Sequence, residues 1–244
     1  MTQYYETPHG RRLAYRHFEG RTGVTFVWLS GFKSDMSGTK VTLLEDWAKN
    51  VGESFLAFDY SGHGLSDGRF EDGTISEWRD DVIDIISGLT DGPLVLVGSS
   101  MGGWMALLAA NELKNRVRAL VLIAPAPDFT QKLIWAGMKP DAREEVEREG
   151  RTLFPSDYGD PYPISKALID DGESWSVLDE PITFDGPVRI LQGMNDEDVP
   201  WQHAFRLIKA ITSEDVIFQL IKDGDHRLSR DEDIARLIKF CSEL

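Results

Sequence analysis

The sequence contains little cysteine and little positive charge. Cys241 is the only cysteine among 244 residues, which excludes an internal disulfide and a cysteine-rich metal site. Lysine and arginine number 26 against 41 aspartates and glutamates, so the formal net charge is -15. A chain this acidic repels nucleic-acid phosphates and anionic membrane surfaces, and we expect neither as a partner.

Long apolar runs are also missing. No window approaches the roughly twenty apolar residues that a membrane-spanning helix requires. The opening stretch, MTQYYETPHGRRLAY, contains neither the apolar core of a secretory signal nor the pattern of a mitochondrial transit peptide. Together with the single cysteine, these absences predict a cytoplasmic protein without a membrane span.

What the chain does contain is a series of short apolar runs that alternate with segments of helical spacing. Such an alternation indicates a mostly parallel sheet with helices on both faces, preceded here by a hairpin of residues 2–7 and 11–18. We therefore predict one α/β domain that spans residues 1–244. The apolar runs are 24–30, 54–60, 93–99, 118–126, 187–193 and 215–221, and the helical segments are 39–51, 75–90, 101–114, 201–212 and 229–243.

One interval breaks the alternation. Between Pro127 and about Pro187 no core strand is expected, and a segment of this length in a compact domain usually serves as a lid or a binding element. We predict a helical lid insertion over residues 127–187. Half of its large apolar residues are expected to hold the lid together and the rest to meet an apolar ligand; the set is Phe129, Leu133, Ile134, Trp135, Met138, Phe154, Tyr158, Tyr162 and Trp175.

The stretch GSSMGG, residues 98–103, lies where the apolar run PLVLV gives way to a helix. Ser100 is the centre of a Gly-x-Ser-x-Gly pattern, which at such a junction predicts a tight turn that exposes a nucleophilic serine at the carboxyl edge of the sheet. The alternative is a glycine-rich helix entry with a capping serine. The partners that a nucleophile needs decide between the two interpretations.

A serine nucleophile needs a base, and a carboxylate must orient that base. Of the five histidines, only His226, in KDGDHRLS, follows a late core strand in a loop. One strand earlier, QGMNDEDVPW offers Asp196 as the acid, with Asp198 as the alternative. The order Ser, Asp, His is the order of an α/β-hydrolase triad. His63 precedes the serine, and we interpret its loop, DYSGHGLSDG, as a structural turn.

These motifs carry a resemblance over essentially the whole chain. The segments GSSMGGW, DYSGHGLSDG, LQGMNDEDVPW and DGDHRLS resemble the α/β-hydrolase superfamily of serine hydrolases. The stretch LSGFKSDMSGTK, together with GSSMGGW and VPW, is similar to the branch that contains the mammalian mitochondrial acyl-protein thioesterase and acyl-glucuronide esterase. In one departure, Ser30-Gly31 replaces the His-Gly of many hydrolases.

Acyl transfer also needs donors for a developing oxyanion. By position we expect the backbone N–H groups of Phe32 and Met101 to supply them. Trp104, Trp135 and Met138 are candidates for substrate binding, although Trp104 is equally suited to the core. No metal and no organic cofactor is implied.

The resulting hypothesis is a serine hydrolase that cleaves esters or thioesters of an apolar acyl group through an acyl-enzyme. A small molecule or an acylated protein would be the substrate, and the sequence does not determine the oligomeric state. Peptidase or perhydrolase activity remains an alternative on the same fold, as does a non-catalytic receptor for a ligand. Ser100 argues against a dehalogenase or an epoxide hydrolase, which need a carboxylate at that position.

Overall fold

The computed structural model describes residues 1–154 and 161–244. An eight-stranded sheet forms its centre, in the order β1-β2-β4-β3-β5-β6-β9-β10. The strands are β1 (Gln3–Glu6), β2 (Arg12–Phe18), β3 (Thr25–Leu29), β4 (Ser54–Phe58), β5 (Leu94–Ser99), β6 (Val117–Ile123), β9 (Val188–Gly193) and β10 (Val216–Ile221).

All strands from β4 across to β10 run parallel, whereas β1 and β2 form an antiparallel hairpin at one edge. Strands β3, β4, β5 and β9 are buried at every residue, which explains why their sequences are apolar without alternation. Each of the six apolar runs identified in the sequence corresponds to one of the parallel strands from β4 across to β10. The carboxyl ends of the parallel strands therefore meet at one edge of the sheet.

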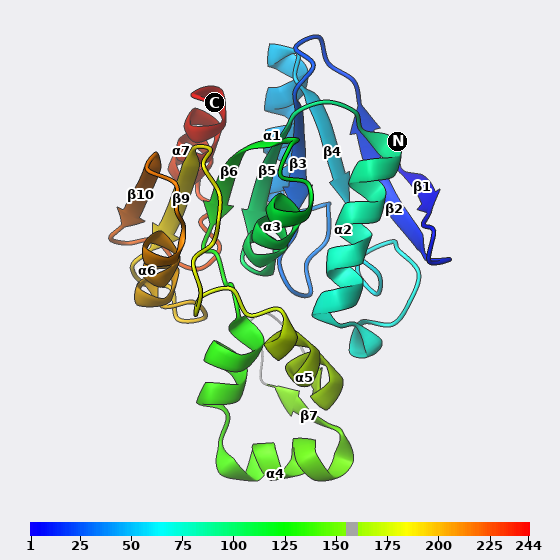
Figure 1. The fold of residues 1–244 in the computed structure, drawn as a ribbon, viewed down its shortest axis with the longest axis vertical. Coiled ribbons are helices and arrows are strands. Elements are labelled where there is room, and N and C mark those ends of the chain that lie inside the picture. The colour runs from blue at the N-terminus through cyan, green and yellow to red at the C-terminus, as the bar shows by residue number, and fades with distance from the viewer. Residues whose placement is uncertain (155–160) are drawn as a thin grey trace.

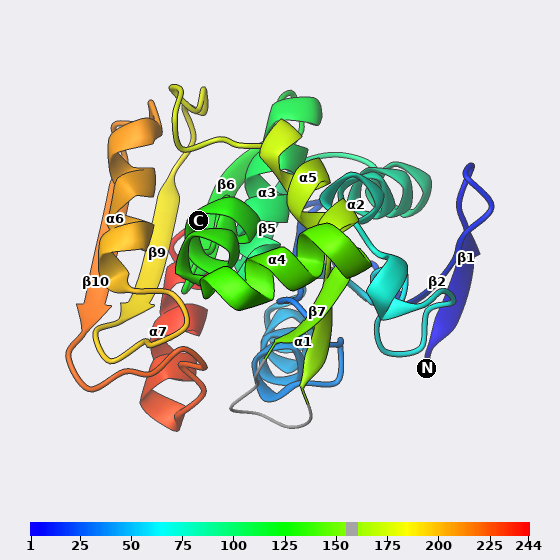
Figure 2. The ribbon, with the colours of Figure 1, turned by 90° about the horizontal axis from the view of Figure 1, so that it is seen from below.

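Helices cover both faces of this sheet. Seen from below in Figure 2, α2, α3 and α6 lie on one side and α1 and α7 on the other. The prediction of an α/β-hydrolase architecture, a mostly parallel sheet with helices on both faces, is confirmed. These helices are α1 (Thr39–Val51), α2 (Ile75–Leu89), α3 (Met101–Glu112), α6 (Trp201–Ala210) and α7 (Asp231–Ser242), and the short helix η1 (Phe70–Asp72) precedes α2.

Residues 127–187 are called the insertion below. Of the described residues, 130–154 and 161–174 extend beyond the carboxyl ends of the strands, and the segment after residue 174 returns along the sheet to the start of β9 (Figure 1). The insertion contains the π-helix η2 (Thr130–Trp135), α4 (Pro140–Glu149) and α5 (Lys166–Ser174). It also contains β7 (Arg151–Phe154) and β8 (Tyr162–Ser165), which pair with each other in a separate antiparallel sheet. The predicted helices are present, and the small sheet is an addition that the sequence did not indicate.

None of the helices in the described part of the chain has the length and apolar character needed to cross a bilayer.

Candidate active site

Ser100 lies in the turn between β5 and α3, in a backbone conformation that an L-residue rarely adopts, with φ 56° and ψ -119°. The flanking glycines explain how so tight a turn forms. A Cβ atom on Gly102 would lie 2.0 Å from the carbonyl oxygen of Leu29, and one on Gly98 would lie 2.3 Å from the carbonyl oxygen of Gly102. Only glycine fits at these two positions.

Backbone hydrogen bonds hold this strained residue to the neighbouring strand. The Ser100 amide donates to the carbonyl oxygen of Ile123 (2.8 Å), and the Ser100 carbonyl accepts from Gly103 (2.9 Å) and Ala126 (3.1 Å). The side chain is thereby presented at the carboxyl edge of the sheet while the backbone cannot relax. A capping role for the serine finds no support, because its side chain makes no capping hydrogen bond to α3.

The Ser100 hydroxyl is the first member of a hydrogen-bonded line of three side chains. Its Oγ lies 3.1 Å from Nε2 of His226, and Nδ1 of the same imidazole lies 2.9 Å from Oδ2 of Asp196. His226 belongs to the loop after β10, and Asp196 to the loop after β9. Three segments that are far apart in sequence therefore converge.

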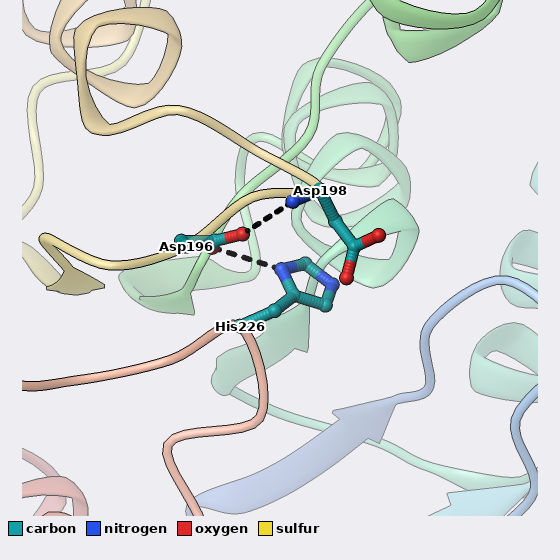
Figure 3. Close-up of side chains that lie close together, drawn as sticks. All are labelled: Asp196, Asp198 and His226. Atoms are coloured by element: carbon teal, nitrogen blue, oxygen red, sulfur yellow. Dashed lines mark hydrogen bonds and ion pairs between the residues drawn. The ribbon is translucent and has the colours of Figure 1, made fainter. Parts of the chain in front are cut away.

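Asp196 is buried, and both oxygens of its carboxylate accept hydrogen bonds. Its Oδ1 accepts from the amides of Asp198 (3.1 Å) and Val199 (2.8 Å), and Oδ2 accepts from Gln192 Nε2 (3.0 Å) as well as facing His226. Figure 3 shows the carboxylate pointing at the imidazole from the β9 side. Such hydrogen bonds hold a carboxylate in one orientation.

Asp198, the alternative acid, lies differently. Its backbone amide donates to Asp196, and its own exposed carboxylate lies beside the edge of the imidazole in Figure 3. The carboxylates of both residues and a ring nitrogen of His226 lie within 4.8 Å of one another, a spacing that a metal ion would also accept. Because the oxygens of Asp196 already receive amide and imidazole donors, the arrangement favours an acid and base pair.

Gln192 also contacts the acid of this site, a role that its sequence position did not indicate. This residue is fully buried near the end of β9, and its amide donates to Asp196 and to the carbonyl oxygen of Val199 (3.0 Å). It therefore holds the acid loop together from behind. The available signal was an uncharged polar side chain near the end of the apolar run PVRILQG, whose other polar residue is Arg189.

The acid and base loops are also tied to each other. Asn195 donates its amide to the carbonyl oxygen of Gly224 (2.9 Å), and a Cβ atom on Gly193 would lie 2.5 Å from that oxygen. On the far side of the base loop, the ammonium of Lys40 donates to the carbonyl oxygen of Arg227. Burial lowers the pKa of this lysine to about 8.

The two candidate oxyanion residues flank Ser100. Met101 is the first residue of α3, where a backbone N–H has no acceptor within its own helix. Phe32 follows Gly31, whose Cα lies against Ser100 so closely that an added Cβ would be 3.3 Å from the serine Cβ. Both amides therefore belong to segments that border the hydroxyl.

These features agree with the outcome of a family comparison, in which residues 26–238 match the Alpha/beta hydrolase family. The chain belongs to that family. Its membership confirms the resemblance seen in the motifs, and the protein is a hydrolase.

Two mammalian relatives are similar over most of this alpha/beta hydrolase. A mouse protein, palmitoyl-protein thioesterase ABHD10, is 39% identical over 95% of this chain and 78% of its own length. The human protein of the same name is 37% identical over 95% of this chain and 76% of its own length.

Two solved structures are similar to this chain over its whole length. A putative hydrolase from Agrobacterium vitis has a TM-score of 0.96 and 40% identity, with 100% of this chain and 98% of the other covered. Mouse alpha/beta hydrolase domain-containing protein 10 has a TM-score of 0.92 and 35% identity, with 100% and 97% covered.

The prediction of a cytoplasmic location is wrong. The mammalian thioesterases similar to this hydrolase, from mouse, cow, orangutan, human and rat, are all named as mitochondrial. These relatives point to mitochondria instead.

Trp104, Trp135 and Met138, the predicted substrate-binding residues of this hydrolase, lie at different depths. Trp104 is fully buried in α3, and its indole N–H donates to the carbonyl oxygen of Trp175 (3.2 Å), which ties the core to the insertion. Met138 is buried as well. Trp135 is half-buried, and the guanidinium of Arg143 lies 5.3 Å from its ring centre.

Aromatic rings connect the insertion with the Phe32 loop. The ring of Phe32 lies 5.3 Å from that of Phe129 and 5.6 Å from that of Tyr162, both in the insertion. On the core side, the same ring lies 4.8 Å from Phe70 and 5.7 Å from Trp78. The ring of Phe32 thus belongs to an aromatic cluster with members from both the insertion and the core. Tyr158, another predicted member, lies outside the described residues.

Two of the basic residues of the insertion lie near acids. Lys166 contacts Asp170 at 2.8 Å, and Arg151 lies 3.9 Å from Glu71. These cations are therefore partly neutralised, which weakens their attraction for an anionic group on a substrate, such as the sugar carboxylate of an acyl glucuronide.

Proposed function

We propose that this hydrolase cleaves thioesters and activated esters of apolar acyl groups through an acyl-enzyme on Ser100. One observation carries the proposal: the unbroken line from Ser100 Oγ through His226 to the buried carboxylate of Asp196, at 3.1 and 2.9 Å. Oxygen, imidazole and carboxylate in this order form the arrangement that activates a serine for acyl transfer.

In the first half of the reaction, Nε2 of His226 accepts the proton of Ser100 as Oγ attacks the acyl carbonyl carbon. The carboxylate of Asp196 accepts a hydrogen bond from Nδ1–H and stabilises the imidazolium that forms. When the tetrahedral intermediate collapses, its bond to the leaving sulfur or oxygen breaks, and His226 returns the proton to that atom. Ser100 then carries the acyl group as an ester.

In the second half, water replaces the serine as nucleophile. His226 accepts a proton from the water molecule as the water oxygen attacks the acyl carbon. The bond between that carbon and Oγ of Ser100 then breaks, His226 returns the proton to Oγ, and the acyl group leaves as a carboxylic acid. In both halves, the amides of Phe32 and Met101 would donate to the oxyanion. Backbone donors of this kind are preorganised, and each is typically worth about 3 kcal/mol in the transition state.

An aromatic cluster of Phe32, Phe129 and Tyr162 supports a preference for apolar acyl groups. An apolar acyl group gains more from such a surface than an extended peptide, which needs backbone hydrogen-bond partners. The names of the mammalian relatives, palmitoyl-protein thioesterases, support a thioester of a long acyl chain, carried by a small molecule or by a protein. Acyl glucuronides are a secondary class of substrate. Their sugar carboxylate would need a cation, and the cations of Lys166 and Arg151 already lie near acids.

The test is a hydrolysis panel on one purified sample. It contains thioesters, p-nitrophenyl esters and glucuronides whose acyl chains range from acetyl to palmitoyl, together with peptides. A fluorophosphonate probe, followed by mass spectrometry of the labelled peptide, identifies the nucleophile. We expect labelling at Ser100 and a higher kcat/KM for octanoyl than for acetyl substrates. Absence of labelling would favour a ligand receptor, and efficient peptide cleavage would favour a peptidase.

A further inference from the structure

His63 is a buried histidine that the proposed mechanism does not use. It lies in the loop after β4 (residues 59–69), only 4% exposed, with the rings of Tyr60, Phe70 and Trp78 at 5.6, 5.2 and 5.2 Å. Burial lowers the pKa of this imidazole to about 4. At neutral pH the ring therefore offers one N–H donor and one lone pair.

The two partners of the ring decide which nitrogen carries the hydrogen. Nδ1 lies 3.1 Å from the carbonyl oxygen of Ser61, a group that can only accept. Nε2 lies 3.2 Å from the backbone nitrogen of Lys33, which can only donate. The hydrogen therefore resides on Nδ1, and the Nε2 lone pair receives the Lys33 amide.

The carbonyl that orients the ring is itself held in place. The indole N–H of Trp78 donates to the same Ser61 oxygen (3.1 Å), and the Ser61 amide donates to the buried carboxylate of Asp81 (2.8 Å). The imidazole is thus fixed on one side by backbone and on three others by aromatic rings. A group held this firmly can position whatever its free nitrogen binds.

What Nε2 binds is the peptide group that follows Phe32. Lys33 has φ 56°, a left-handed conformation that is unfavourable for a lysine and needs external restraint. A second restraint lies further along the same loop, where the amide of Met36 donates to Asp59 Oδ1 (2.7 Å). The loop after β4 therefore holds the loop after β3 at two amides.

We propose that His63 is a positioning residue for the oxyanion hole: its Nε2 accepts the Lys33 amide and so fixes the direction in which the neighbouring N–H of Phe32 points. The proposal rests on the proposed function, because the oxyanion arises only in acyl transfer at Ser100. His63 touches neither the substrate nor the reacting atoms. Its loss is expected to weaken binding of the transition state more than binding of the substrate.

Two substitutions separate the acceptor from the rest of the side chain. In His63→Asn, the side-chain amide replaces Nδ1 and still donates to Ser61, whereas the Lys33 amide loses its partner. In His63→Gln, the longer side chain brings a carbonyl oxygen to the place of Nε2, where it accepts from Lys33. A substitution at the half-buried His17 of β2, His17→Asn, is the matched control for removal of a histidine.

The expected result is a split between kcat and KM. With p-nitrophenyl octanoate, kcat falls about 10- to 100-fold in His63→Asn, less than the loss of a whole oxyanion donor, whereas KM changes by less than about threefold. His63→Gln restores kcat to within about fivefold of the parent, and His17→Asn leaves it unchanged. Affinity for a trifluoromethyl ketone, which forms a tetrahedral adduct, falls in parallel with kcat.

Folded His63→Asn protein with unchanged kcat and ketone affinity would overturn the proposal. So would equal losses of kcat and thermal stability in both the Asn and the Gln variants, because these indicate a role in packing alone. If the Asn variant does not fold, ¹⁵N-histidine NMR of the parent protein decides: the hydrogen must be on Nδ1 of His63, and finding it on Nε2 refutes the argument. Failure of the parent to hydrolyse esters, or to be labelled at Ser100, would instead refute the proposed function.

Discussion

The strand ends and the insertion of this hydrolase differ in how tightly their polar groups are bound. At the strand ends, Asp196 is 6% exposed and its carboxylate receives two amides, an imidazole and a side-chain amide. In the insertion, Arg148 and Glu149 of α4 form an ion pair with 70% and 58% of their side chains exposed. An exposed pair of this kind contributes little to stability. Positional precision is thus concentrated at the strand ends, where the reaction would occur.

The insertion is nevertheless anchored at its base. Asp128, buried and with φ 56°, accepts the amides of Val177 (2.8 Å) and Leu178 (3.0 Å) and the hydroxyl of Ser176 (2.8 Å). One carboxylate therefore joins the start of the insertion to its returning segment. This difference between a fixed base and an exposed outer part is what a substrate-selecting element on a rigid catalytic frame requires.

The sharpest test of the comparison is removal of the nucleophile. Ser100→Ala should reduce ester and thioester hydrolysis by about 10⁴-fold or more, because no other group can form the acyl-enzyme. The melting temperature should change little, since only a half-buried hydroxyl and its contact with His226 are lost and the strained φ of 56° is kept. Initial rates and circular dichroism on the same preparation provide the check. Retention of most activity in folded protein would place the chemistry elsewhere.

The strand ends could be predicted from sequence, for a physical reason. Glycines at 98 and 102, and a loop histidine and aspartate after late apolar runs, have few explanations other than convergence at one sheet edge. The pairing of β7 with β8 could not be predicted, because four-residue strands in a polar segment produce no clear periodicity. Contacts such as that of His63 with Lys33 depend on how two loops meet, which no local pattern encodes.

A second test concerns the two neighbouring carboxylates. Asp196→Asn should lower kcat by about 10³- to 10⁴-fold, because an amide in this place favours the wrong imidazole tautomer and cannot stabilise the imidazolium. Asp198→Asn should cost less than about tenfold, since its exposed carboxylate is not the partner of Nδ1. Steady-state kinetics on the two isosteric variants compare them directly. The reverse ranking would make Asp198 the acid.

Acid titration extends the comparison to stability. The pKa of His63 is about 4 in the folded protein against an ordinary value of 6.5, so between these values the unfolded chain binds a proton that the folded chain does not. The free energy of unfolding should therefore fall as pH drops from 6.5 to 4, by roughly 3 kcal/mol from this residue alone. Exposed ion pairs of the insertion should contribute little to the slope.

Urea unfolding of the parent and of His63→Gln at several pH values between 4 and 7 measures this effect. The variant has no imidazole to titrate, so its stability should depend less steeply on pH over that range. The half-buried His17 provides the comparison through His17→Asn, for which we expect a smaller change in slope. Parallel slopes in the parent and in His63→Gln would show that other groups dominate the acid titration.

The smallest expected effect lies in the insertion and concerns the choice of substrate. The ring of Tyr162 lies 5.6 Å from that of Phe32, and the ring of Phe154 lies 6.0 Å from that of Tyr162. If the insertion selects the acyl group, Tyr162→Ala should lower kcat/KM about tenfold for octanoyl and palmitoyl thioesters, which corresponds to the loss of about 50 Å² of apolar contact. Acetyl substrates should change by less than about twofold, because a two-carbon acyl group does not extend that far. Phe154→Ala is the matched control and should affect both classes little. An equal loss for acetyl and long-chain substrates would mean that Tyr162 supports the Phe32 loop instead of the acyl chain, and the division of labour between strand ends and insertion would fail at that residue.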